Sequence, residues 1–70
     1  MRSMFTIEEV AEMLDMKTGQ VENELDGGHL GFTYQDGEKR ITMYDLEKYM
    51  GEQQMLTIVR EYLSQKADQA

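Results

Sequence analysis

Few side chains in this sequence have the chemistry of a catalytic or metal-binding site. The chain contains no Cys and a single His, His29. Zinc sites need several thiolate or imidazole ligands at a set spacing, and His29 has no second such ligand nearby in the sequence. The fourteen Asp and Glu residues are spread over expected helix exteriors rather than paired as in an acid–base site. We therefore expect a non-enzymatic protein with no metal and no other cofactor.

The charge balance is strongly acidic. Seven Lys and Arg residues oppose the fourteen acids, which gives a formal net charge of −7. A free-standing DNA-binding protein is usually basic, because neutralising phosphates supplies much of its affinity. The composition therefore predicts either that the few cations are concentrated at one site or that the partner is not DNA.

The sequence gives no sign of a membrane or secretory protein. It has no run of about 20 apolar residues, which a membrane-spanning helix requires. The absence of Cys is in keeping with a reducing compartment. We expect a cytoplasmic protein with no membrane partner.

The first part of the chain predicts two helices joined by a tight turn. Thr6 and Glu9 have the spacing of a capping box, and apolar residues then follow at helical spacing: Ile7, Val10, Ala11 and Leu14. A second helix is expected over residues 18–26, where Gly27 and Gly28 end it. Two helices joined in this way form a helix-turn-helix unit.

The middle of the chain predicts a two-stranded β-hairpin. Asp36-Gly37 lies between two β-favouring runs, residues 31–34 and 39–41, and Asp-Gly is a strong signal for a tight hairpin turn. Thr42 and Asp45 then have capping-box spacing for a third helix, which Gly51 ends. Residues 1–51 are expected to form one packed domain.

A last amphipathic helix is expected over about residues 52–65, followed by a polar tail, so that residues 52–70 form a C-terminal segment. Its apolar residues could fold back onto the domain and enlarge a thin core. They could instead form a homodimer interface, for which the candidates are Met55, Ile58, Val59, Tyr62 and Leu63. Two turns of apolar residues are short for a coiled coil, so packing within the chain is favoured.

Three segments together resemble one family. Residues 6–14 look like the opening helix of excisionase-type and MerR-type domains, residues 28–31 like the step into their wing, and residues 39–47 like the exit from the wing. The resemblance spans Phe5 to Met50. It implies a winged helix-turn-helix fold, mostly α with a small β-hairpin: three to four helices and a two-stranded wing.

The resemblance also implies a function and a set of residues. In this family the second helix enters the major groove and the wing contacts the DNA backbone. Mapped onto this chain, the DNA-binding residues would be Lys17, Thr18, Gln20 and Asn23 on the helix and Lys39 and Arg40 on the wing. Such a protein would be a transcriptional regulator or a phage or plasmid accessory factor that binds double-stranded DNA.

Two departures from the family pattern motivate an alternative. Lys17 occupies the position where the family has a Ser-like helix cap, so Thr18 is expected to cap the helix one residue later. The same helix carries Glu22, Glu24 and Asp26 where the family tends to have cations. Glu22 and Glu24 lie about 200° apart on a helix, so they cannot both point away from a groove. The alternative is an acidic module, or nucleic-acid mimic, that binds a basic protein partner.

Three aromatic side chains leave a further choice open. Phe32, Tyr34 and Tyr44 could stack on bases, as aromatic residues do in proteins that bind single strands. Packing in the core or against the hairpin is the favoured interpretation.

Overall fold

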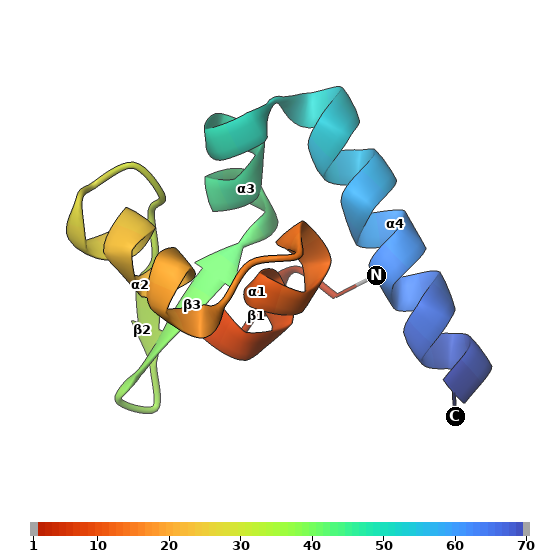
Figure 1. Ribbon diagram of the computed structural model, residues 1–70, viewed down its shortest axis with the longest axis horizontal. Helices are drawn as coiled ribbons and strands as arrows, with labels where there is room; N and C mark the ends of the chain where they lie inside the picture. The colour runs from red at the N-terminus through yellow and green to blue at the C-terminus, as the bar shows by residue number, and fades with distance from the viewer. Residues whose placement is uncertain (1, 70) are drawn as a thin grey trace.

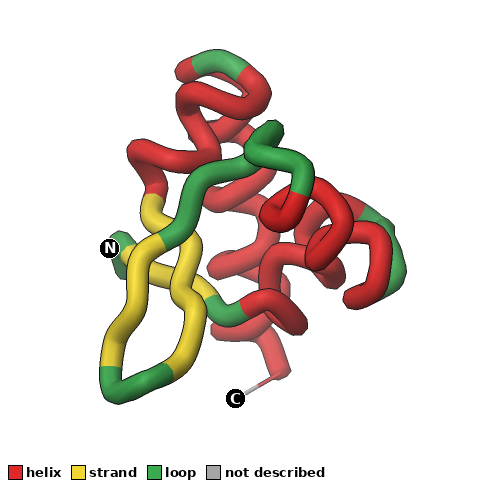
Figure 2. Tube along the Cα trace, turned by 90° about the vertical axis from the view of Figure 1, so that its left-hand side faces the viewer, coloured by secondary structure: helices red, strands yellow, loops and turns green. Residues whose placement is uncertain are grey.

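The computed structural model describes residues 2–69 and is mostly helical, with a small antiparallel sheet (Figure 1). Its elements run in the following order: β1 (Met4–Phe5), α1 (Ile7–Leu14), α2 (Thr18–Asp26), β2 (Thr33–Gln35), β3 (Glu38–Thr42), α3 (Met43–Met50) and α4 (Glu52–Gln69). Figure 2 shows the strands along one side of the molecule and the helices along the other.

Helices α1 and α3 begin with complete capping boxes, as predicted. At α1 the Glu9 N–H donates to Thr6 Oγ1 over 3.1 Å, and the Thr6 N–H donates to Glu9 Oε1 over 2.9 Å. At α3 the Asp45 N–H donates to Thr42 Oγ1, and the Thr42 N–H donates to Asp45 Oδ2, each over 3.0 Å. Each box provides acceptors for backbone donors that have no partner within the helix.

Helix α2 spans the residues predicted for it, but its cap differs from the expectation. Its N-cap is Lys17 and Thr18 is already its first helical residue, so the prediction that Thr18 caps it is wrong. The left-handed backbone of Asp15 (φ 54°) ends α1, and only two residues remain before α2 starts. This short turn leaves Lys17 with the extended backbone of a cap position.

Gly28 ends α2 in the left-handed conformation, with φ of 75°. Its N–H donates to the Leu25 carbonyl over 3.1 Å, and the His29 N–H donates to the Glu24 carbonyl over 3.0 Å. A residue with a Cβ would be strained at this φ, so the glycine is needed here. The chain then reverses through residues 29–32 to reach the hairpin.

The sheet has three strands in the order β1-β3-β2, so the expectation of a two-stranded ribbon is wrong. Met4 pairs with Thr42 and Phe5 with Ile41, which places β3 in the centre. Two residues are too few to show an alternating pattern, and the sequence therefore gave no strand signal before α1. The hairpin itself is as predicted: Asp36 and Gly37 both have positive φ, as a type I′ turn requires.

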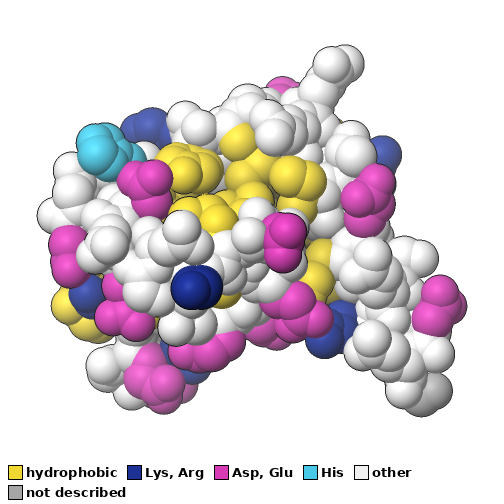
Figure 3. Space-filling model, viewed as in Figure 1, with side chains coloured by type: hydrophobic (Ala, Val, Ile, Leu, Met, Phe, Trp, Pro, Cys, Tyr) yellow, Lys and Arg dark blue, Asp and Glu magenta, His cyan; other side chains and the backbone are white. Residues whose placement is uncertain are grey.

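A single core joins the sheet to all four helices. Its fully buried side chains include Phe5, Val10, Val21, Ile41 and Val59. Phe5 meets Tyr62 of α4 edge to face, with ring centroids 6.3 Å apart. Partly buried apolar side chains reach the surface between α3 and the α1–α2 turn (Figure 3).

Helix α4 folds back onto this core and runs to Gln69, beyond the predicted end at residue 65. Met55, Val59 and Tyr62 are buried within the chain, while Ile58 and Leu63 are half-buried. Most of the face considered for a homodimer therefore packs internally. Across residues 2–69, no helix combines the length and apolar character needed to cross a membrane.

Candidate nucleic-acid interface

The four candidate residues at the start of α2 are all exposed: Lys17, Thr18, Gln20 and Asn23. They are held in place by Val21 and Leu25, which are buried on the opposite side of the helix. Gln20 already has a structural partner, because the Lys17 N–H donates to its Oε1 over 2.8 Å. Gln20 must give up this bond, or use its amide N–H alone, to contact a base.

The two candidate cations of the hairpin are neighbours on β3, where Tyr34 pairs with Lys39 and Thr33 with Arg40. Both side chains are substantially covered, with 31% of Lys39 and 23% of Arg40 exposed. Lys39 Nζ lies 3.8 Å from Asp26 Oδ1, and Arg40 Nη1 lies 3.7 Å from Glu38 Oε2. Each cation is thus partly neutralised by an acid of the same chain.

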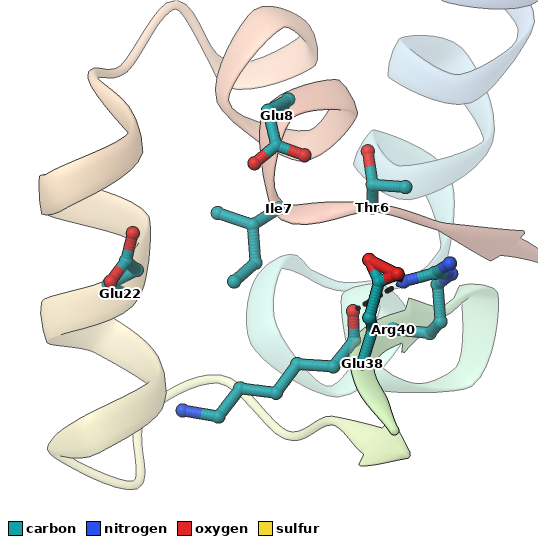
Figure 4. A pocket seen from close by; sticks show the side chains of 7 residues that line it. Thr6, Ile7, Glu8, Glu22, Glu38 and Arg40 are labelled. Carbon is teal, nitrogen blue, oxygen red and sulfur yellow. Dashed lines mark hydrogen bonds and ion pairs between the residues drawn. The ribbon is translucent and has the colours of Figure 1, made fainter. Parts of the chain in front are cut away.

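An open hollow of about 310 Å³ lies between the start of α1, the side of α2 and the hairpin. Figure 4 shows Glu8 and Glu22 on the two helices and the Glu38–Arg40 pair on the hairpin below them. The hollow is lined by Thr6, Ile7, Glu8, Glu22, Glu38, Lys39 and Arg40. The structure thus brings Lys39 and Arg40 together, but the hollow does not include Lys17, and its carboxylates outnumber its cations.

The acids of α2 point in different directions. Glu22 lines the hollow (Figure 4), whereas Glu24 contacts Tyr49 of α3. The Tyr49 hydroxyl donates to Glu24 Oε1 over 3.2 Å, and His29 Nδ1 lies 2.8 Å from Glu24 Oε2. Burial raises the pKa of Tyr49, and the Glu24 carboxylate raises it further. Glu24 therefore has a structural role, and Glu22 and Asp26 are the acids of α2 that a ligand would meet.

The chain has a stronger electrostatic contact away from this surface. Arg2 donates to both carboxylate oxygens of Glu9, over 2.7 and 2.6 Å. Together with the bonds from Thr6, this lowers the pKa of Glu9 to about 2. The pair buttresses the start of α1 and contributes no cation to the hollow.

The aromatic side chains at the hairpin, Phe32 and Tyr34, are exposed and do not pack in the core. Tyr34 is 64% exposed and Phe32 36% exposed, and the two rings meet edge to face with centroids 5.5 Å apart. Lys39 Nζ lies 5.0 Å from the Phe32 ring centroid. Phe32 precedes β2 in the structure. In the strand expected over residues 31–34, its spacing from Tyr34 was the available sequence signal for a shared face.

Within residues 2–69, no three His, Asp or Glu side chains are grouped so as to hold a metal ion. Comparison with known proteins found no matching protein family, no matching curated protein and no matching solved structure.

Proposed function

We propose that this protein is a small, non-enzymatic, cytoplasmic DNA-binding protein of the winged helix-turn-helix type, acting as a transcriptional regulator or an excisionase-like accessory factor. One observation carries the proposal: the α1–α2 corner is followed directly by the β2–β3 hairpin, and α2 exposes polar side chains beside it. In winged helix-turn-helix proteins a helix in this position enters the major groove and a hairpin in this position contacts the backbone, and this order of elements supports the proposal.

Each candidate residue has a role in this proposal. Asn23 is suited to bidentate contact with adenine, and Lys17 to guanine or a phosphate. Thr18 donates its hydroxyl to a phosphate oxygen, and Gln20 contacts a base once its bond to Lys17 opens. Lys39 and Arg40 contact phosphates from the hairpin.

The ion pairs on the hairpin do not prevent this contact. Asp26 and Glu38 are largely exposed and their cations lie 3.7–3.8 Å away. Because the acids are exposed and these distances are too long for a direct hydrogen bond, each pair contributes only about 0–1 kcal/mol, and a phosphate can replace the carboxylate. Because Glu8 and Glu22 remain nearby, we expect a single copy of the chain to bind DNA weakly. Two copies on adjacent half-sites should bind more tightly.

The experiment is fluorescence polarisation on DNA from the protein's own upstream region, beginning at about 50 mM salt, where counterion release favours binding. Arg40→Ala should weaken binding and reduce the slope of log K against log salt by about one. Glu38→Gln should strengthen binding, because it frees Arg40.

Arg60→Ala is the matched control, because Arg60 is an exposed cation on α4, outside the hollow. It should leave the salt slope close to that of the parent protein. Absence of binding at low salt, or equal losses in Arg40→Ala and Arg60→Ala, would contradict the proposal.

A second candidate function is favoured by Glu22 and Asp26, which occupy the exposed side of α2. We propose as the alternative that this acidic face binds a basic protein partner. Glu22→Lys should then reduce partner binding more than Arg40→Ala does, whereas DNA binding predicts the opposite order.

A further inference from the structure

One face of the hairpin carries exposed aromatic side chains beside charged ones, which is the composition of a docking surface. Tyr34 pairs with Lys39, so both side chains lie on the same face of the sheet. Phe32, just before β2, contacts both of them: its ring meets the Tyr34 ring edge to face and lies under Lys39 Nζ. Asp26 of α2 lies at the border of this face, where its carboxylate is paired with Lys39. We call Phe32, Tyr34 and Asp26 the aromatic ledge.

The ledge already holds one cation of this chain. Lys39 Nζ lies 5.0 Å from the Phe32 ring centroid and 3.8 Å from Asp26 Oδ1. An ammonium group set between an aromatic face and a carboxylate is favoured by both the ring quadrupole and the negative charge. Tyr34 extends the same surface with a ring that is mostly exposed.

The backbone beside the ledge is also open. β2 is an edge strand in the order β1-β3-β2. The Gln35–Glu38 pair closes the two-residue turn and is hydrogen-bonded in such hairpins, so at the next pair, Tyr34–Lys39, the backbone groups point away from the partner strand. The N–H and C=O of Tyr34 therefore face the open edge, where another strand can pair.

We propose that the aromatic ledge and the β2 edge form a docking site for an extended, arginine-bearing segment of a protein partner. The segment pairs with the backbone of Tyr34, and its guanidinium group lies against the Tyr34 ring near Asp26. The inference deepens the second candidate function, on which it rests, by naming the surface and the partner's chemistry. Charge favours a basic peptide over a nucleic acid here, because Asp26 and Glu38 are more than two-thirds exposed.

The test uses a short synthetic peptide in which Val and Arg alternate, titrated into the ¹⁵N-labelled full chain at about 0.15 M salt to screen distant charges. Chemical-shift changes are expected at residue 26 and residues 32–36. A peptide with Glu in place of Arg, and one with an N-methylated backbone, should both fail to bind.

Variants then separate ring contact from general charge. Tyr34→Ala should weaken binding by roughly fivefold, Tyr34→Phe should retain it, and Asp26→Asn should weaken it. Tyr44→Ala is the matched control, because Tyr44 on α3 is equally exposed at 64%; it should bind as the parent does.

Four results would overturn the proposal. If the shifts centre on Glu22 and Tyr34→Ala binds normally, the protein-binding function stands but this docking site does not. If no peptide binds, both fall. Equal binding of the N-methylated peptide would exclude strand pairing. Perturbation of residues 32–36 by an oligo-dT strand, and not by the peptide, would assign the ledge to nucleic acid.

Discussion

The starts of α1 and α3 differ from the start of α2. Helices α1 and α3 each begin with a threonine whose hydroxyl accepts a backbone hydrogen bond. An acidic side chain three residues later accepts a hydrogen bond from the N–H of that threonine. Helix α2 begins at Lys17, whose side chain has no acceptor for the helix, and only Gln20 reaches back. Helices α1 and α3 thus have starts encoded by local residue types, whereas the start of α2 has no such side-chain cap. Such local departures are common at functional sites.

The start of α1 should give the largest effect, and this effect should disappear in acid. Because hydrogen bonds from Arg2 lower the folded-state pKa of Glu9 to about 2, below its ordinary 4.5, ionised Glu9 stabilises the fold fully above pH 4.5. That stability, about 2 kcal/mol after allowance for solvent screening, is lost as the pH falls from 4.5 toward 2. Urea unfolding of the parent and of Glu9→Gln should differ most near pH 7 and converge only as the pH falls to about 2. A constant difference over this range would contradict the assignment.

The start of α3 should be sensitive to a residue outside it. A Cβ on Gly31 would lie 2.7 Å from Asp45 Oδ1, so Gly31→Ala must displace the acid of the α3 capping box. We expect a loss of about 1–2 kcal/mol in the free energy of unfolding. Gly19→Ala in α2 is the matched control, because its Cβ would meet no atom within 4 Å; it should stabilise the protein, as alanine favours helix. Equal effects of the two variants would show that the Gly31–Asp45 approach is not tight.

Removing a threonine cap should distinguish the helix starts directly. Thr6→Ala should lower the free energy of unfolding by about 1 kcal/mol, because Glu9 N–H then loses its acceptor. Thr6→Ser should retain most of the stability. Thr18→Ala should change stability by less than about 0.5 kcal/mol, as expected for an exposed residue that caps nothing. A large loss in Thr18→Ala would restore the discarded assignment of Thr18 as the cap of α2.

Giving α2 a proper cap should have the smallest effect. Lys17→Ser places a side-chain acceptor at the N-cap and should stabilise the protein by about 0.5 kcal/mol. Lys17→Ala removes the same charge without adding an acceptor and should give no such gain. If DNA is the ligand, both variants should bind it less well than the parent. Thermal unfolding and polarisation on the same samples measure the two effects.

Local signals in the sequence predicted much of the fold. Both capping boxes, the bounds of α2 and the Asp36-Gly37 turn follow from residue types at fixed offsets, and all are present. The strand β1 could not be predicted, because its pairing with residues 41–42 depends on contacts between distant parts of the chain. The cap of α2 was misplaced because the length of the α1–α2 turn, rather than the preference of Thr18, decides it.

The candidate site was predictable in its position but not in its electrostatics. The sequence placed Lys39 and Arg40 on one strand, yet the pairing of Lys39 with Asp26 depends on how α2 lies against the hairpin. Glu38 and Arg40, by contrast, are two residues apart on β3 and pair locally. Similarly, the opposite directions of Glu22 and Glu24 follow from helical geometry, but the partners of Glu24 come from the following loop and α3.

The pairing of Met4 with Thr42 has a consequence for how the protein is made. During synthesis β1 leaves the ribosome well before β3, the strand with which it pairs. Phe5 therefore stays exposed while α1 and α2 have already emerged. Closure of the sheet cannot precede the emergence of residue 42, and burial of Phe5 under Tyr62 comes later still. Stalled nascent chains ending shortly after residue 42 should therefore remain more sensitive to protease than chains that include α4.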